Sequence, residues 1–158
     1  MSSPFVILSD EFQCILGKTP TLELLSSDFK FSEGVCWVER GQFLIVSDFL
    51  NDRVMKWRES EGLSVFRQPA QTANGNTVDA QGRIISCLTR ARSVVRFEHD
   101  GSETVIADSY QGGRLTSPND VVVKSDGTIW FTDPDYGWLV AEFGHCQPPE
   151  QHRNRVYR

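Results

Sequence analysis

Residues 117–137 read SPNDVVVKSDGTIWFTDPDYG, which places two short runs of apolar, β-favouring residues on either side of a polar turn. The first run is Val121–Val123, and the second begins at Ile129. The turn is Ser-Asp-Gly, and its Gly127 can take up the positive φ that a tight hairpin needs. The stretch therefore predicts a β-hairpin over residues 119–133.

The same pattern occurs twice earlier in the chain, as EGVCWVERGQFLIVSD at residues 33–48 and as NGNTVDAQGRIISCLT at residues 74–89. The turn glycines, Gly41, Gly82 and Gly127, are 41 and 45 residues apart. We expect all three to adopt positive φ. A repeat of this length indicates an architecture built from similar modules.

Further short strands follow these hairpins. They are RVMKW and LSVF at 53–57 and 63–66, SVVRF and TVIA at 93–97 and 104–107, and RVYR at 155–158. Four strands recurring every 41 to 45 residues are typical of β-propeller blades. A β-sandwich is the alternative, but it does not impose a four-strand period. We predict an all-β propeller fold with two complete blades and three strands of a third.

The amino-terminal residues stand outside the repeats. TLELL at residues 21–25 precedes the first hairpin as TVIA precedes the third, so it predicts an orphan fourth strand that needs a host blade. Residues 9–17 carry apolar side chains at helical spacing and predict a short helical turn. This division gives an amino-terminal extension at 1–20 and a propeller domain at 21–158.

An insertion separates the second and third strands of the third repeat. It adds about 17 residues within 134–153 and is rich in Pro, Gly and aromatic residues. Two interpretations stay open: a surface loop, or a lid over a site.

Composition limits the class of protein. The 158 residues carry 21 acidic and 16 basic side chains, a net charge of −5, which argues against a nucleic-acid partner. No apolar run approaches the length of a membrane span, and the amino terminus lacks a signal-peptide pattern. Four cysteines without a CxxC pair favour free thiols in the cytoplasm, with a disulfide framework as the alternative.

Each hairpin opens with a polar residue eight positions before its turn glycine. These residues are Glu33, Asn74 and Asn119. The first strand of a propeller blade lines the central channel, so we expect the three side chains to converge at one mouth of it. Their oxygen atoms suit Ca²⁺ or Mg²⁺. The alternative is that they bond nearby backbone where loops enter strands.

Three segments carry a family resemblance: FSEGVCW, ANGNTVDAQGRIISC and, above all, SPNDVVVKSDGTIWFTDPDYG. Together they resemble the SMP-30/gluconolactonase/LRE family of six-bladed β-propellers. The resemblance implies a divalent-metal-dependent hydrolase that converts sugar lactones such as D-glucono-1,5-lactone to the open acid. A small-molecule lactone is then the expected partner, and the oligomeric state is undetermined.

The resemblance also implies roles for individual residues. Glu33 falls on a metal-binding Glu, and Asn119 falls on a channel Asn that contacts metal or substrate. Asn74 would line the pocket, and Tyr136 could stack on a sugar, with a core role as the alternative. The implied cofactor is a divalent cation, Ca²⁺ first and Mg²⁺ or Zn²⁺ as alternatives. Thr89 stands where relatives often carry His.

The predicted blades account for about half of a ring. At about 42 residues a blade, six blades need about 250 residues. The resemblance implies that Glu33 is a metal ligand and that the candidate base is an Asp of a later blade, which would lie beyond residue 158. We expect the 158 residues alone to bind metal weakly and to hydrolyse no lactone at a useful rate. Alternatives are a non-catalytic propeller binding module, or a related metal-dependent esterase or organophosphatase.

Overall fold

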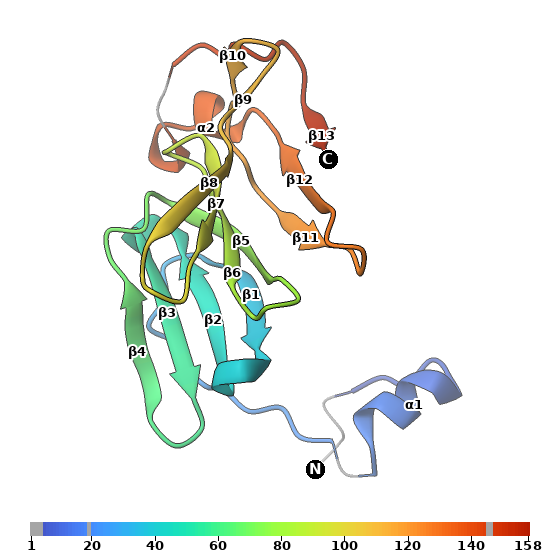
Figure 1. Ribbon diagram of the computed structural model, residues 1–158. Helices are drawn as coiled ribbons and strands as arrows, with labels where there is room; N and C mark the ends of the chain where they lie inside the picture. The colour runs from blue at the N-terminus through green and yellow to red at the C-terminus, as the bar shows by residue number, and fades with distance from the viewer. Residues whose placement is uncertain (1–4, 19, 145–146) are drawn as a thin grey trace.

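The computed structural model describes residues 5–18, 20–144 and 147–158, and it is nearly all β (Figure 1). The first blade is an antiparallel four-stranded sheet in the order β1-β2-β3-β4. Its strands are β1 (Ser32–Val38), β2 (Phe43–Asp48), β3 (Arg53–Arg58) and β4 (Gly62–Arg67). The predicted first repeat is therefore confirmed, including both of its outer strands.

The second and third blades follow the same plan. The second is a four-stranded sheet and the third a three-stranded sheet, each in sequential antiparallel order. Their strands are β5 (Ala73–Val78), β6 (Ile84–Leu88), β7 (Ser93–Phe97), β8 (Glu103–Ala107), β11 (Val121–Val123), β12 (Ile129–Asp133) and β13 (Arg155–Tyr157). A two-stranded ribbon, β9 (Ser109–Tyr110) with β10 (Gly113–Arg114), joins the second blade to the third. Two blades and three strands of another agree with the prediction.

The hairpin turns correct one expectation. Gly82 and Gly127 adopt positive φ, at 74° and 85°, but in the first blade Gln42 takes the left-handed position, at 52°, in place of Gly41. The cause is a 3₁₀ turn at Glu39–Gly41, which moves the left-handed position one residue on. Gly41 is needed for space, because a Cβ there would lie 2.1 Å from the ring of Phe43.

The core consists of two apolar clusters, each between adjacent blades. One joins the first and second blades through Val38, Ile45, Val54, Ala70, Ala73, Ile84, Leu88 and Val95. The other joins the second and third blades through Ile85, Cys87, Val94, Leu115, Val121 and Phe131. Since alternate residues of a strand point to opposite faces, β6 contributes Ile84 to one cluster and Ile85 to the other. The second blade is thus covered on both faces.

The amino-terminal segment contains the predicted helix but not the predicted strand. Helix α1 (Asp10–Leu16) begins after Ser9, whose Oγ accepts a hydrogen bond from the backbone N–H of Phe12, and it stands apart from the blades in Figure 1. Residues 21–25 form no strand, and Leu22 and Leu24 are exposed. The strand prediction was wrong for this structure because a strand needs a neighbour to satisfy its backbone groups, and no described strand pairs with it.

The structure also bears on the expected free thiols and on the expected lack of a membrane span. Among the described residues Cys14, Cys36 and Cys87 are free, whereas Cys146 lies outside the described ranges. No helix in the described ranges has both the length and the apolar character needed to cross a bilayer.

Candidate functional site

All four sequence-predicted site residues line one cavity of about 190 Å³. Glu33 lies in β1, Asn74 in β5, Asn119 just before β11, and Tyr136 at the start of α2 (Tyr136–Leu139). The rest of the wall is Phe31, Phe49, Thr89, Ser117 and Phe143. The prediction that the three blade-opening residues converge is therefore matched by the geometry. The cavity lies where the inner strands of the three blades meet.

Two glycines let those inner strands approach closely. Each follows a cavity residue directly: Gly34 comes after Glu33, and Gly75 comes after Asn74. A Cβ on Gly34 would lie 2.0 Å from the backbone oxygen of Asn74, and the N–H of Gly75 donates a 2.7 Å hydrogen bond to the backbone oxygen of Asn119. Gly34 in the first blade therefore lets Asn74 of the second blade come close, and Gly75 in the second blade does the same for Asn119 of the third.

A buried carboxylate holds the segment that leads into Asn119. Asp133, at the end of β12, accepts hydrogen bonds from the backbone N–H groups of Thr116 and Ser117 at 2.6–3.0 Å. Ser117 Oγ in turn donates to the backbone oxygen of Pro134 and accepts from the N–H of Gly137. These bonds fix both the approach to Asn119 and the start of α2.

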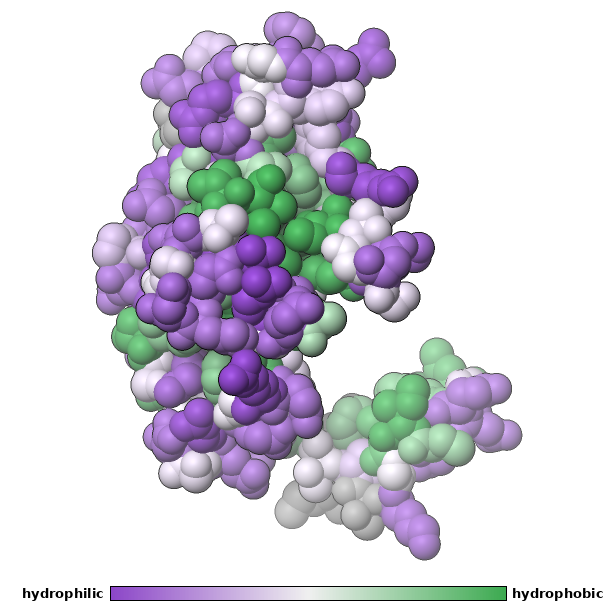
Figure 2. Space-filling model, in the orientation of Figure 1, coloured by the Kyte–Doolittle hydropathy of each residue, from purple (hydrophilic) through white to green (hydrophobic). Residues whose placement is uncertain are grey.

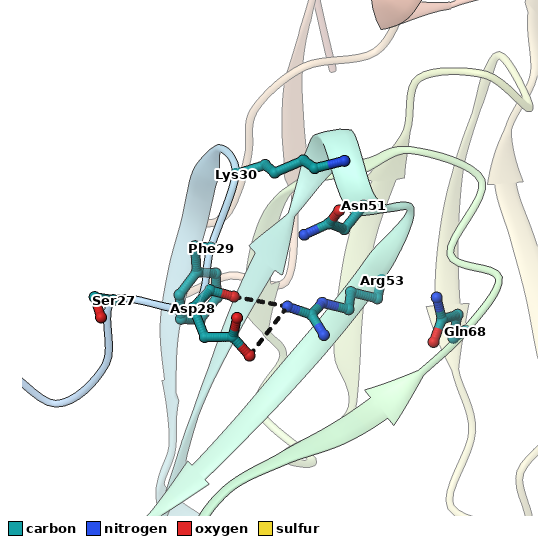
Figure 3. Close-up of a pocket in the computed structure, with 7 residues that line it drawn as sticks. All are labelled: Ser27, Asp28, Phe29, Lys30, Asn51, Arg53 and Gln68. Atoms are coloured by element: carbon teal, nitrogen blue, oxygen red, sulfur yellow. Dashed lines mark hydrogen bonds and ion pairs between the residues drawn. The ribbon is translucent and has the colours of Figure 1, made fainter.

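The segment that leads into Glu33 is held in a similar way. Asp48, at the end of β2, accepts from the backbone N–H groups of Lys30 and Phe31, and Arg53 Nε donates to its second oxygen at 2.8 Å. Arg53 also reaches the backbone oxygen and the carboxylate of Asp28 (Figure 3). Burial alone would raise the pKa of Asp48, but the hydrogen bonds it accepts hold that pKa below its ordinary value.

A second hollow, of about 420 Å³, lies beside Asp28 and Arg53. Figure 3 shows the residues that line it. It is lined by Ser27, Asp28, Phe29, Lys30, Asn51, Arg53 and Gln68. Arg53 and Asn51 are engaged with Asp48 and Asp28. We therefore assign this hollow a structural role in anchoring the chain before β1.

The cavity residues differ from their neighbours in hydrogen bonding. The side chains of Glu33, Asn74 and Asn119 make no hydrogen bond with any other residue in the described ranges. The surrounding polar groups are engaged: Asn76 bonds Ser86 and Ser47, and Thr89 bonds the backbone of Pro118. Unengaged amide and carboxylate groups beside a cavity are available to a ligand.

An aromatic wall closes one side of the cavity. Phe143 packs against Phe31 and Phe49, with ring centroids 6.0 and 5.4 Å apart. Phe143 belongs to the short 3₁₀ turn Ala141–Phe143 within the insertion, and Tyr136 belongs to the same insertion. Of the two interpretations left open, the surface loop and the lid, the lining position favours the lid.

Sequence reasoning missed five wall residues, and three of them had a signal. Phe31 and Ser117 each lie two positions before a predicted site residue, and Thr89 stands where relatives often have His. Phe49 directly follows β2, a position that the repeats did not single out. Phe143 had no signal, because the insertion that supplies it has no counterpart in the other repeats.

The donor set suits a hard cation in part. Carboxylate and amide oxygens are ligands that Ca²⁺ accepts, and Glu33, Asn74 and Asn119 supply one carboxylate and two amides. Across residues 5–18, 20–144 and 147–158, no three His, Cys, Asp or Glu side chains come together as a metal site. Ca²⁺ takes about six to eight oxygen ligands, so these three residues can form only part of its shell.

Comparison with known proteins identifies relatives that match most of this chain. The family model described as the SMP-30/Gluconolactonase/LRE-like region matches residues 31–140. A gluconolactonase of Zymomonas mobilis is 30% identical over 95% of this chain and 46% of its own. The structure of a gluconolactonase from Xanthomonas campestris matches with a TM-score of 0.81 at 38% identity, over 84% of this chain and 45% of that one.

A putative gluconolactonase of known structure matches to the same extent. Its TM-score is 0.79 at 34% identity, and the match covers 84% of this chain and 46% of that one. The chain therefore spans a little under half the length of the relatives it matches.

Proposed function

The chain belongs to the SMP-30/gluconolactonase/LRE-like family, and from this premise we propose that it carries half of a metal-dependent sugar-lactone hydrolase site. The observation that supports the proposal is the set of three unengaged polar side chains, Glu33, Asn74 and Asn119, on one cavity. The relatives named gluconolactonase supply the substrate class.

In this proposal Glu33 and Asn119 hold a divalent cation, Ca²⁺ first. Such an ion, when bound, supplies Lewis-acid polarisation of the lactone carbonyl. Glu33 would give its carboxylate oxygens to the ion, and Asn119 its amide oxygen. Asn74 would donate from its amide nitrogen to a hydroxyl or carbonyl oxygen of the substrate.

The aromatic side chains would orient the sugar ring and exclude water. Tyr136 offers an exposed ring face at the cavity rim, suited to stacking on a sugar. Phe31, Phe49 and Phe143 would keep one side of the cavity dry, which strengthens polar interactions within it. No described carboxylate other than Glu33 lines the cavity, so the general base would come from outside the three blades described.

A chimera tests this proposal directly. Residues 31–158 would replace the matching half of the Xanthomonas campestris gluconolactonase, and hydrolysis of D-glucono-1,5-lactone would be followed with and without a chelator. We expect chelator-sensitive hydrolysis that falls by about 100-fold or more in Glu33→Gln. Glu59→Gln, an exposed carboxylate on the β3–β4 turn, is the matched control and should retain activity. Full activity and metal content in Glu33→Gln would contradict the assignment.

A further inference from the structure

A groove of about 350 Å³ lies between the first and second blades, at the end opposite to the cavity. Its lining comes from the β1–β2 and β5–β6 turns and from strands that include β4 and β7. Glu33 and Asn74 stand near the starts of β1 and β5, whereas these turns follow the ends of the same strands, at the lower end of the blades in Figure 1. A propeller packs any further blade against the first or the third of these blades, not between the first and the second.

The lining of the groove is largely apolar and aromatic. Val38 and Ile84 are 4% and 6% exposed, and the rings of Phe43, Phe66 and Phe97 lie beside them. The ring centroids of Phe43 and Phe66 are 6.3 Å apart, and Phe66 is 39% exposed. In the view of Figure 2, mostly hydrophilic side chains cover this end of the first two blades. An apolar recess lined by aromatic rings is therefore a local feature, suited to a flat apolar group.

Most charged groups beside the groove are already paired. Arg83 forms ion pairs with Asp79 and Glu98, at 2.7 and 3.2 Å. Arg67 pairs with Glu103 of the second blade at 2.8 Å. Glu98 is the carboxylate that lines the groove, and its engagement with Arg83 offsets its repulsion of an anion.

Arg40 is the exception among these cations. It is exposed on the β1–β2 turn, and no carboxylate within the described ranges forms an ion pair with it. Its Nη1 lies 2.9 Å from Nε2 of His99, on the second blade, and the same Nε2 lies 3.1 Å from the backbone oxygen of Gln81. A guanidinium only donates and a carbonyl oxygen only accepts, so this single nitrogen can satisfy one of them and not both. Arg40 is therefore a cation at an apolar groove that lacks an anionic partner.

We propose that this groove binds a small aromatic carboxylate, with the ring among the three phenylalanines and the carboxylate on Arg40. The aromatic lining selects the flat apolar body. The guanidinium selects an anion that can accept two parallel hydrogen bonds, as a carboxylate does. The volume of about 350 Å³ falls within the usual range of small-molecule sites, about 300–1,000 Å³. The inference concerns the end of the blades away from the cavity and does not depend on the proposed lactone hydrolysis.

Titration of the chain with 3-phenylpropionate, followed by ¹H–¹⁵N NMR, tests the proposal. We expect saturable shifts of the backbone N–H signals of Gly41 and Gly82, which line the groove, with a dissociation constant of about 1 mM or lower. The signals of Gly34 and Gly75, beside the cavity, should stay in place. Two matched compounds separate the two features, because 3-phenylpropanol keeps the ring without the charge and propionate keeps the charge without the ring. Each should bind about 10-fold or more weakly.

Three variants test the role of the guanidinium. Arg40→Gln should weaken binding of 3-phenylpropionate by about 10-fold or more, to the level of 3-phenylpropanol. Arg90→Gln is the matched control, because Arg90 is an exposed arginine on the β6–β7 turn, at the other end of the second blade, and its loss changes the net charge equally. His99→Ala removes the contact between the two blades but leaves the guanidinium, so affinity should be retained. The spectrum of each variant shows whether it is folded.

Several outcomes would overturn the proposal. The first is the absence of saturable shifts at Gly41 and Gly82 with 3-phenylpropionate, or their appearance at Gly34 and Gly75 instead. Equal affinities for 3-phenylpropionate and 3-phenylpropanol, or wild-type affinity in Arg40→Gln, would show that the guanidinium takes no part. If Arg40→Gln does not fold, the comparison of the two compounds and the result for His99→Ala still decide. Binding of decanoate in place of 3-phenylpropionate would overturn the choice of an aromatic body.

Discussion

Asp48 and Asp133 perform the same task in two different blades. Each is a buried residue at the end of its blade's second strand, and each accepts hydrogen bonds from two successive backbone N–H groups. In both blades the two N–H groups belong to the residues three and two positions before the cavity residue, which is Glu33 in the first blade and Asn119 in the third. The two carboxylates thus set the position from which each cavity residue enters its inner strand. The second blade has Leu88 at the corresponding position and instead joins Thr89 to Thr72 through backbone groups.

The first prediction concerns the stability that the hydrogen bonds accepted by Asp48 and Asp133 provide. Asp48→Asn and Asp133→Asn each replace a charged acceptor with an amide whose NH₂ faces N–H donors. We expect each to lower the free energy of unfolding by about 3 kcal/mol, measured by urea denaturation. Asp126→Asn is the control, because Asp126 accepts similar bonds in an exposed turn, and its loss should be much smaller. Equal losses of stability at all three positions would argue against a special stabilising role for the two buried carboxylates.

The second prediction follows from the lowered pKa of Asp48. A carboxyl group whose pKa is lower in the folded state than its ordinary 3.8 contributes stability above that value. The contribution disappears as the pH falls through the folded-state pKa, because the folded protein must then take up the proton. The urea midpoint of the wild-type chain should therefore fall steeply below about pH 4. Asp48→Asn should flatten that acid limb, and parallel curves for the two proteins would count against this account.

The sequence predicted the local hairpins well and the long-range features less well. The hairpins over residues 33–48, 74–89 and 119–133 were predictable because apolar runs and a turn glycine act over a few residues. Glu33, Asn74 and Asn119 were found because the repeat places them at one distance from that glycine.

What the sequence did not reveal depends on contacts between distant segments. Phe143 reaches the cavity only because the insertion folds back onto Phe31 and Phe49. The strand predicted at 21–25 depends on a partner strand, so its own apolar pattern was insufficient. Gln42 replaced Gly41 at the left-handed position because a 3₁₀ turn changed the loop by one residue, a difference that residue propensities do not reveal.

The third prediction concerns thiol reactivity. Burial raises the pKa of Cys87 well above its ordinary value, and the nearby Asp120 and Asp133 add to the effect. Cys14 is exposed on α1. Alkylation at neutral pH, mapped by mass spectrometry of peptides, should modify Cys14 rapidly and Cys87 only on unfolding, because the thiolate is the reactive form and burial restricts access. Equal rates at the two sites in the folded chain would contradict the buried position of Cys87.

The last prediction concerns the glycines that bring successive blades together at the cavity. Gly34 has φ +54°, and a Cβ there would lie 2.0 Å from the backbone oxygen of Asn74, so Gly34→Ala must push the second blade's cavity residue away. Gly62 is the matched control, since its φ of +73° is also left-handed but no atom lies within 4 Å of an added Cβ. We expect urea denaturation to show a loss of about 1 kcal/mol for Gly62→Ala and about 3 kcal/mol or more for Gly34→Ala. The difference between the two measures crowding alone, because the conformational penalty is shared. Equal losses would mean that the blades can separate at this point without cost, and that Gly34 does not position Asn74.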